Sequence, residues 1–301
     1  MAVSKLSLPL RDGVGASSIV LPPGPWPTIL DFLIERFPGV PRAEILRRGS
    51  AGDILDDAGA PLGAHVPYQS GARLFYYRHV EDEAPIPFEE TILFQDEFLI
   101  VADKPHFLPM SPVGAYAKET LLARLKRRTG IATLAPMHRL DRETAGVVVF
   151  TVKPETRGAY QRLFAGREVE KSYEAIAQTR AALEFPLVAR HRIVADDHFM
   201  RMRVAEGAPN AETRIECIDV RGDWARYALH PATGKKHQLR VQMAALGMPI
   251  VNDTLYPEMR EAQAGFGAPL QLLARSLAFR DPITGARREF ASLRQLNWTP
   301  A

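Results

Sequence analysis

The sequence predicts an α+β fold in which a small α+β domain, residues 1–80, precedes a large mixed, mostly antiparallel sheet in residues 91–301. Three observations lead to this prediction. Short runs of β-branched and aromatic residues outnumber helical patterns after residue 91, whereas two short helices and a hairpin fit into the first 80 residues. Between the two parts lies a linker, residues 81–90, that is acidic and contains Pro85 and Pro87.

The small domain is expected to begin with an extended, irregular segment, because residues 1–25 are rich in glycine and proline. Thr28 is a suitable N-cap for a first helix, which a Pro-Gly pair would end. A second helix is expected over residues 41–48, since a proline suits a first helical turn. Residues 73–77 are typical of a strand.

The larger part is expected to combine many short strands with three helices, at residues 120–128, 156–167 and 239–246. The outward face of the first of these helices carries four basic residues, which are either solvated surface or phosphate contacts. Strands are expected at residues 92–94, 98–102, 147–150, 169–177, 188–194, 200–204, 213–220, 224–229, 270–279 and 287–290.

The composition is that of an ordinary globular protein, with 46% hydrophobic and 24% charged residues. No apolar run approaches the roughly 20 residues of a membrane helix, and the first ten residues lack the form of a signal peptide. We therefore expect a cytoplasmic protein that makes no membrane contact and acts as a monomer. The single cysteine, Cys217, excludes an internal disulfide and a cysteine-rich zinc site, and its alternating neighbours predict a half-buried strand thiol.

The net charge of +3 is unevenly distributed along the chain. Residues 1–90 contain 8 Lys and Arg against 12 Asp and Glu, a balance of −4, and residues 91–301 contain 30 against 23, a balance of +7. A polyanionic partner would therefore be held mainly by the larger part.

Residues 138–151 combine a polar cluster with a buried strand. Six polar or charged residues precede an Ala-Gly pair and four strand-forming residues, which predicts a loop that leads into the interior. Asp141 lies in this loop between two arginines. Neighbouring cations favour the ionised form of a carboxyl group, so we expect a nucleophile or a base and not a general acid. The alternative is a surface turn whose charges pair with one another.

Three stretches resemble, in the same order, the motifs of RluA-type pseudouridine synthases. Residues 138–146 are similar to the family's His-Arg-Leu-Asp-x-x-Thr-Ser/Ala-Gly signature, residues 171–175 to Lys-x-Tyr-x-Ala, and residues 232–240 to Thr-Gly-Arg-x-His-Gln-Leu-Arg. Residues 103–105 resemble the family's Asp-Lys-Pro loop, where the substrate-side wall begins. The resemblance covers roughly residues 90–300 and implies the pseudouridine synthase fold, with a central cleft across its sheet.

The resemblance also implies an isomerase that converts a specific uridine of ribosomal or transfer RNA to pseudouridine. Asp141 would be the catalytic carboxylate, and the sequence leaves open whether it attacks C1′ or removes a ribose proton. Arg240 would pair with Asp141 and keep it ionised, while Tyr173 would stack on the uracil and take the C5 proton. Arg139 matches the family arginine that fills the place of the flipped nucleotide, a role compatible with a phosphate contact.

The remaining candidates for RNA binding and base flipping are His138, Lys235 and His237. We expect the two histidines to support the loops that carry Asp141 and Arg240. The spacing of the histidines lacks a helical i, i+4 pair and cysteine partners, so no metal site is expected. Neither a dinucleotide nor a triphosphate motif is present, so no cofactor is expected. The resemblance implies an RNA stem-loop as the partner.

The first 80 residues resemble the compact RNA-binding domain, also called the alpha-L type, that is named after a small-subunit ribosomal protein and often precedes this catalytic domain. Their acidic balance leaves a structural accessory domain as the alternative.

Two rival functions come from other classes: a catalytically silent RNA-binding or folding-assistance protein, and a carboxylate-dependent glycosidase or hydrolase. The intact Asp-Tyr-Arg trio argues against the first, and the lack of an evident second carboxylate argues against the second. Lys235, Gln242 and Asn252 depart from the family's usual Arg, His and Gly. We expect these three side chains at the rim of the cleft, where they would change substrate preference.

Overall fold

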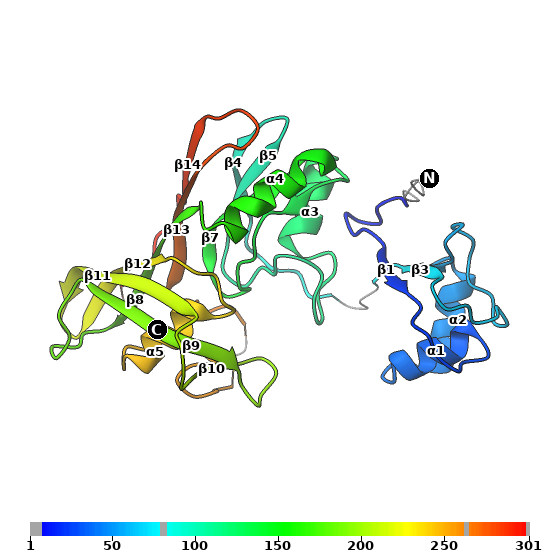
Figure 1. Ribbon diagram of the computed structural model, residues 1–301, viewed down its shortest axis with the longest axis horizontal. Helices are drawn as coiled ribbons and strands as arrows, with labels where there is room; N and C mark the ends of the chain where they lie inside the picture. The colour runs from blue at the N-terminus through cyan, green and yellow to red at the C-terminus, as the bar shows by residue number, and fades with distance from the viewer. Residues whose placement is uncertain (1–7, 79–82, 262–264, 299–301) are drawn as a thin grey trace. The chain divides into compact units, whose positions relative to one another are not determined.

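The computed structural model describes residues 8–78, 83–261 and 265–298. Contacts divide the chain into two compact units, each drawn in Figure 1. Unit 1 consists of Met1–Ala84 and Ser111–Ala132, and unit 2 of Pro85–Met110 and Thr133–Ala301. The domain limits inferred from the sequence differ from this division in two respects. The expected linker is divided after residue 84, and residues 111–132 are grouped with the first unit.

The described residues of unit 1 form a three-stranded antiparallel sheet in the order β1-β3-β2, together with three helices. Thr28 caps the first helix as expected, in a reciprocal capping box with Asp31. Nine buried hydrophobic side chains from the helices, strands and loops form its main core. The elements are β1 (Ser17–Val20), α1 (Ile29–Arg36), α2 (Arg42–Ser50), β2 (Ile54–Leu55), β3 (Arg73–Tyr76) and α3 (Leu121–Thr129).

The expectation of an irregular segment over residues 1–25 was wrong for residues 17–20, and residues 1–7 lie outside the described part of the chain. Strand β1 lies there and pairs antiparallel with β3, from Ser17 opposite Tyr76 to Val20 opposite Arg73. The flanking glycines and prolines indicated a loop, but the hydrogen-bonding edge of β3 is more than 50 residues away in the sequence. Long-range pairing therefore decides the conformation of this segment.

The segment between the two predicted domains is less exposed than expected. The carboxylate of Glu83 accepts hydrogen bonds from the backbone N–H groups of Ala117, Lys118 and Glu119 at 2.6–2.9 Å. Ile86 is buried, with 3% of its surface exposed. Acidic and proline-rich composition indicated a solvated linker, but it does not reveal which backbone groups or apolar surfaces lie nearby.

Unit 2 contains an eleven-stranded sheet whose main order is β10-β9-β11-β12-β8-β13-β7-β5-β4. Strand β14 pairs with β13, and β6 with β7. All of these pairings are antiparallel except that of β13 with β7, so the predicted mixed, mostly antiparallel sheet is confirmed. Its strands are β4 (Thr91–Gln95), β5 (Leu99–Lys104), β6 (Ala135–Pro136), β7 (Ala145–Thr151), β8 (Glu170–Gln178), β9 (Leu187–Ala195), β10 (Met202–Ala205), β11 (Ala211–Arg221), β12 (Trp224–Pro231), β13 (Leu272–Arg280) and β14 (Arg287–Ala291).

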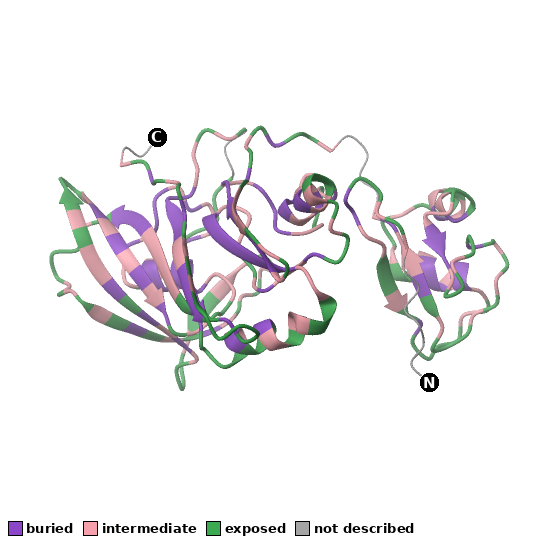
Figure 2. Cartoon of the chain, turned by 90° about the horizontal axis from the view of Figure 1, so that it is seen from above, coloured by how far each residue is buried: buried purple, intermediate pink, exposed green. Residues whose placement is uncertain are grey.

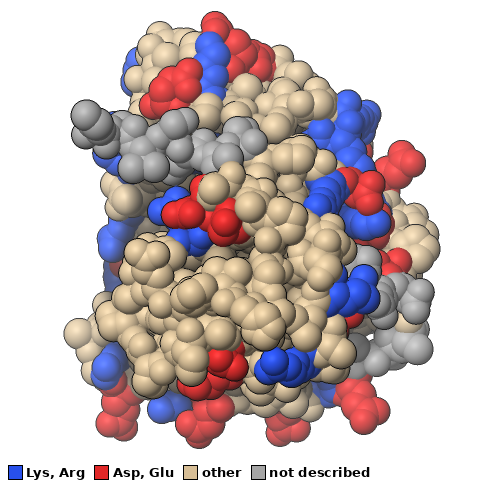
Figure 3. Space-filling view, turned by 90° about the vertical axis from the view of Figure 1, so that its right-hand side faces the viewer, with Lys and Arg blue, Asp and Glu red and all other residues tan. Residues whose placement is uncertain are grey.

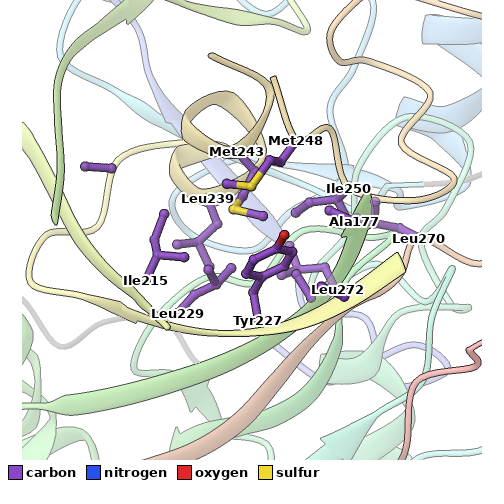
Figure 4. Close-up of a cluster of buried hydrophobic side chains, with 13 residues drawn as sticks. Ala177, Ile215, Tyr227, Leu229, Leu239, Met243, Met248, Ile250, Leu270 and Leu272 are labelled. Carbon is purple, nitrogen blue, oxygen red and sulfur yellow. The ribbon is translucent and has the colours of Figure 1, made fainter. Parts of the chain in front are cut away.

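Two helices complete unit 2, α4 (Pro154–Ala165) and α5 (Gln238–Ala245). Helix α5 packs against the sheet through a cluster of buried side chains, shown in Figure 4. Leu239 and Met243 of the helix lie among Tyr227 and Leu229 of β12 and their neighbours on other strands. Burial of these side chains fixes the position of the helix on the sheet.

The pairing of β7, β13 and β8 brings two of the recognised motifs together. The start of β7 lies beside β13, with Ala145 opposite Leu273, and the next residue of β13 lies opposite Tyr173 of β8. Gly146 has φ 116°, and a Cβ there would lie 2.2 Å from the carbonyl oxygen of Ala274. Only glycine fits this close approach, which accounts for the glycine that ends the first motif.

Burial follows the sheets, as Figure 2 shows by the purple segments within the strands. Every residue of β5 and of β7 is buried, so these strands form the interior of unit 2. Cys217 lies half-buried on β11, as predicted. On the face drawn in Figure 3, Lys and Arg are intermingled with Asp and Glu, so no broad field of one sign covers that face. None of the described helices is long and apolar enough to cross a membrane.

Candidate active site

Asp141 lies in the loop between β6 and β7, where three basic side chains surround its carboxylate. The nearest is Arg240, whose Nη1 lies 3.5 Å from Oδ2. His237 Nε2 lies 3.7 Å from the same oxygen, and Arg139 Nη2 lies 4.0 Å from Oδ1. The side chain of Asp141 is 17% exposed. A carboxylate with these neighbours, open on one side, is placed to act on a bound molecule as an anion.

Arg240 is fixed by a second carboxylate, that of Asp253. Its Nε and Nη2 donate to the two Asp253 oxygens at 2.8 and 2.7 Å, and both side chains are almost fully buried. Burial opposes the charge of Arg240, but the hydrogen bonds and charge of Asp253, with a contribution from Asp141, outweigh it and raise the pKa. This bidentate contact orients the guanidinium so that Nη1 remains directed at Asp141.

His237 precedes α5 in the left-handed conformation, with φ 54°. Its Nδ1 lies 2.9 Å from the hydroxyl of Tyr256, which itself accepts a hydrogen bond from the N–H of Met202. Burial lowers the pKa of His237 to about 4, although the charge of Asp141 opposes this change. The ring is therefore neutral at neutral pH, with Nδ1 hydrogen-bonded to Tyr256 and Nε2 on the side of Asp141.

Tyr173 of β8 completes the trio. Burial, together with the charge of Asp141, raises the pKa of its phenol to about 12. The hydroxyl is therefore protonated at neutral pH. It can accept a proton only after it has donated the proton that it already carries.

One cavity of about 100 Å³ is lined by six of the seven site residues that the sequence predicted. Its walls come from the loop after β6, from β8 and from the segment leading into α5. We call it the catalytic cavity, and the six residues are Arg139, Asp141, Tyr173, Lys235, His237 and Arg240. No group of three His, Cys, Asp or Glu side chains that could hold a metal ion occurs in the part of the chain that the structure describes.

His138 is the predicted residue that does not line the catalytic cavity. Its ring stacks on Phe164 at 4.9 Å, and its Nε2 accepts the N–H of Val149 at 3.2 Å. Burial lowers its pKa to about 4, so it is neutral. These contacts attach the beginning of the Asp141 loop to β7 and α4.

Sequence reasoning did not find two residues that hold the site. Asp253 had no assigned partner, because its contact with Arg240 depends on how the chain returns after α5. Lys104, in the motif expected to begin the substrate-side wall, is fully buried and outside the catalytic cavity. Its ammonium donates at 2.8–3.0 Å to the carbonyl oxygens of Pro105, Leu108 and Arg142, the last of which lies beside Asp141.

The expected position of Gln242 at the rim was wrong. Its side chain is completely buried and bonds to the hydroxyl of Thr213 and the carbonyl of Ala189. Gln242 faces the sheet from the inner side of α5, where helical periodicity places it four residues after Gln238. Lys235 does line the catalytic cavity, and Asn252, with φ 63°, bonds to the carbonyl of Pro269.

Comparison with known proteins agrees with this geometry. A family model described as RNA pseudouridylate synthase matches residues 98–245. The chain is 33% identical over 211 residues to tRNA pseudouridine synthase C of Vibrio cholerae, covering 64% of this chain and 86% of that protein. It is 26% identical to RNA pseudouridine synthase 7 of rice (Oryza sativa subsp. japonica), covering 76% of this chain but only 60% of that relative. The solved structure of human RNA pseudouridylate synthase domain containing 1 is similar in fold, with a TM-score of 0.57, 23% identity and coverage of 68% of this chain and 84% of that one.

Proposed function

The chain belongs to the RNA pseudouridylate synthase family, and from that membership we propose that it isomerises a specific uridine of a transfer or ribosomal RNA, with Asp141 as the catalytic carboxylate. Transfer RNA is the first candidate, because it is named for the Vibrio cholerae relative. Every residue of the proposed site comes from unit 2 of one chain, which is consistent with a monomeric enzyme.

The observation that carries the proposal is the arrangement around Asp141. The carboxylate is partly exposed to the cavity, whereas the guanidinium beside it is held from behind by Asp253. Arg240 can therefore favour the anion without occupying the space in front of it. Tyr173 lines the same cavity and presents an aromatic side chain to a base in that space.

The reaction is an isomerisation, and its atoms balance without a cofactor. The N1–C1′ bond breaks, the uracil turns, the C5–C1′ bond forms, and the hydrogen of C5 is lost while N1 gains one. Attack of Asp141 on C1′ and removal of a ribose proton by Asp141 both require the carboxylate to be ionised, which the neighbouring Arg240 favours. Nε2 of the neutral His237, 3.7 Å from the same carboxylate, adds a polar group on that side.

Arg139 is proposed to contact the RNA around the target nucleotide and not the uracil that reacts. Its side chain is 67% exposed at the wall of the cavity, within 4.0 Å of Asp141. A uridine in a stem or loop must leave its stack to reach Asp141, at a cost of a few kcal/mol. An extended arginine at the entrance is placed to fill the vacated position and to contact phosphates.

Tritium release from RNA labelled at uridine C5 tests the proposal, since the C5 hydrogen is exchanged only when C5 bonds to carbon C1′. Total RNA from cells that lack this gene serves as the substrate, and Asp141→Asn as the matched control. We expect release by the wild type without free uracil, and none by the variant. Free uracil would instead indicate a glycosidase, and RNA binding without release would indicate a silent binder.

A further inference from the structure

A second cavity, of about 400 Å³, adjoins the catalytic cavity in unit 2. We propose that it binds the phosphodiester of the nucleotide that flanks the target uridine, with Arg167 and Lys171 as its principal anion-binding groups. This inference rests on the proposed function, because it takes the flanking nucleotide from the same RNA strand. We call this cavity the flanking cavity.

The charged side chains of the flanking cavity all carry positive charge. Four basic residues line it, and no carboxylate is among its described lining residues. Arg139 lies 4.0 Å from the Asp141 carboxylate at the catalytic end, and the cations that converge on the rest of the cavity favour an anion between them. The four are Arg139, Arg167, Lys171 and Lys235.

Lys171 is the cation of this cavity whose surroundings most favour an anion as a partner. Its Nζ donates to the carbonyl oxygen of Thr233 at 3.0 Å, a neutral partner. Burial, and then the charge of Arg167, lower the pKa of Lys171. An ammonium in a partly buried place beside a second cation gains more from a phosphate than an exposed lysine does.

Arg167 is held in an unusual conformation at this position. It follows α4 with φ 59°, in the left-handed region that a bulky residue seldom adopts. Its backbone N–H is bonded to the carbonyl of Phe164, which fixes the turn and directs the chain out of the helix beside the cavity. The N–H of Glu168 bonds to the carbonyl of Leu163 as well, so this is a usual helix end, and it places the Arg167 side chain at the wall of the cavity.

The rest of the lining suits a sugar and base beside a phosphate. Met137, Phe164 and Val169 supply an apolar side, and Phe164 is backed by the stacked ring of His138. The volume of about 400 Å³ lies within the range of small-molecule sites. A single nucleotide presents both kinds of surface, an apolar face and an anionic phosphate.

The two cavities adjoin each other, which points to the class of ligand. They share six lining residues, among them Arg139, Lys171 and Tyr173. A strand whose uridine lies against Asp141 must leave the catalytic cavity in some direction. The flanking cavity offers cations and no carboxylate in that direction, so the adjacent phosphodiester is the group that its chemistry fits.

A double-mutant cycle, which combines variants of the 301-residue chain with modified RNAs and measures binding, tests this assignment. The probe is a transfer RNA stem-loop in which each loop phosphate is replaced in turn by an uncharged methylphosphonate. Binding is measured in the Asp141→Asn background, so that the result does not depend on turnover. Arg167→Gln is compared with Arg162→Gln, a matched control that removes an exposed arginine of α4 outside the flanking cavity.

We expect Arg167→Gln to weaken binding of the unmodified stem-loop by roughly 5-fold and to lower the salt slope by about 0.7, the value for one contact to a single strand. At one methylphosphonate position, next to the target uridine, the variant should cause no further loss, because the contact is already absent. The loss of affinity caused by the control variant, Arg162→Gln, should add to the loss caused by the methylphosphonate at every position of the loop. Additive losses for Arg167→Gln at every loop position would overturn the assignment. If the Arg167→Gln effect disappears at one methylphosphonate position as expected but the wild type releases no tritium, the result would count against the proposed function alone.

Discussion

Two carboxylates share the guanidinium of Arg240, and we predict that they differ sharply in what their removal does. Asp253 is 1% exposed at its side chain and accepts two short hydrogen bonds from Arg240, whereas Asp141 is 17% exposed and lies 3.5 Å away. Asp253 Oδ1 also accepts the backbone N–H groups of Leu255 and Tyr256. Asp253→Asn therefore leaves a buried cation without its main partner, which costs about 3–5 kcal/mol of unfolding free energy.

The same variant should also lose activity, since Arg240 is no longer oriented toward Asp141. A misplacement of about 1 Å in a catalytic group lowers the rate by roughly 100-fold. Asp141→Asn should abolish turnover. Its loss of unfolding free energy should be smaller than that of Asp253→Asn by at least about 2 kcal/mol, because Asp253 still pairs with Arg240. Urea unfolding of both variants, together with tritium release, measures the two effects. Equal stability losses, or an Asp253→Asn enzyme as stable as the wild type, would refute this division of roles.

Tyr173→Phe should keep the aromatic contact with the uracil and slow the reaction by roughly 100-fold or more, with the RNA dissociation constant unchanged within a factor of two; wild-type turnover would leave the hydroxyl without a role. Between pH 6.5 and 4 the unfolded chain takes up protons at His138 and His237 that the folded protein does not bind, because both folded pKa values are lowered to about 4. Stability should therefore be fully present above pH 6.5 and fall with acidification, by up to about 1.4 kcal/mol per pH unit for each histidine; an unfolding midpoint that stays constant from pH 7 to 5 would contradict this. Removal of residues 1–85 deletes the Glu83 carboxylate that accepts three N–H groups before α3, so amide exchange at the start of that helix should accelerate. If the segment is not an RNA reader, as its acidic balance suggests, the salt slope of RNA binding should change by less than the roughly 0.9 of one duplex phosphate contact.

Local patterns in the sequence were sufficient for most of the elements. Runs of β-branched residues predicted the buried strand β7, and the Thr28 cap predicted the start of α1. Both depend on interactions within a few residues, whose energies are the same wherever the segment lies in the fold. The resemblance of three short, ordered motifs to a known family also indicated the catalytic family, because each motif is recognised from consecutive residues alone.

The tertiary structure alone decided which distant groups meet. Strand β1 forms because β3 offers it an edge, and the parallel pairing of β7 with β13 determines that the Asp141 loop lies beside Tyr173. The contact of Arg240 with Asp253 likewise joins two parts of the chain that carry no mutual signal in sequence. Hydrogen bonds and charges act over a few ångströms in space, so their partners are chosen by the packing that brings the segments together and not by the spacing of residues along the chain.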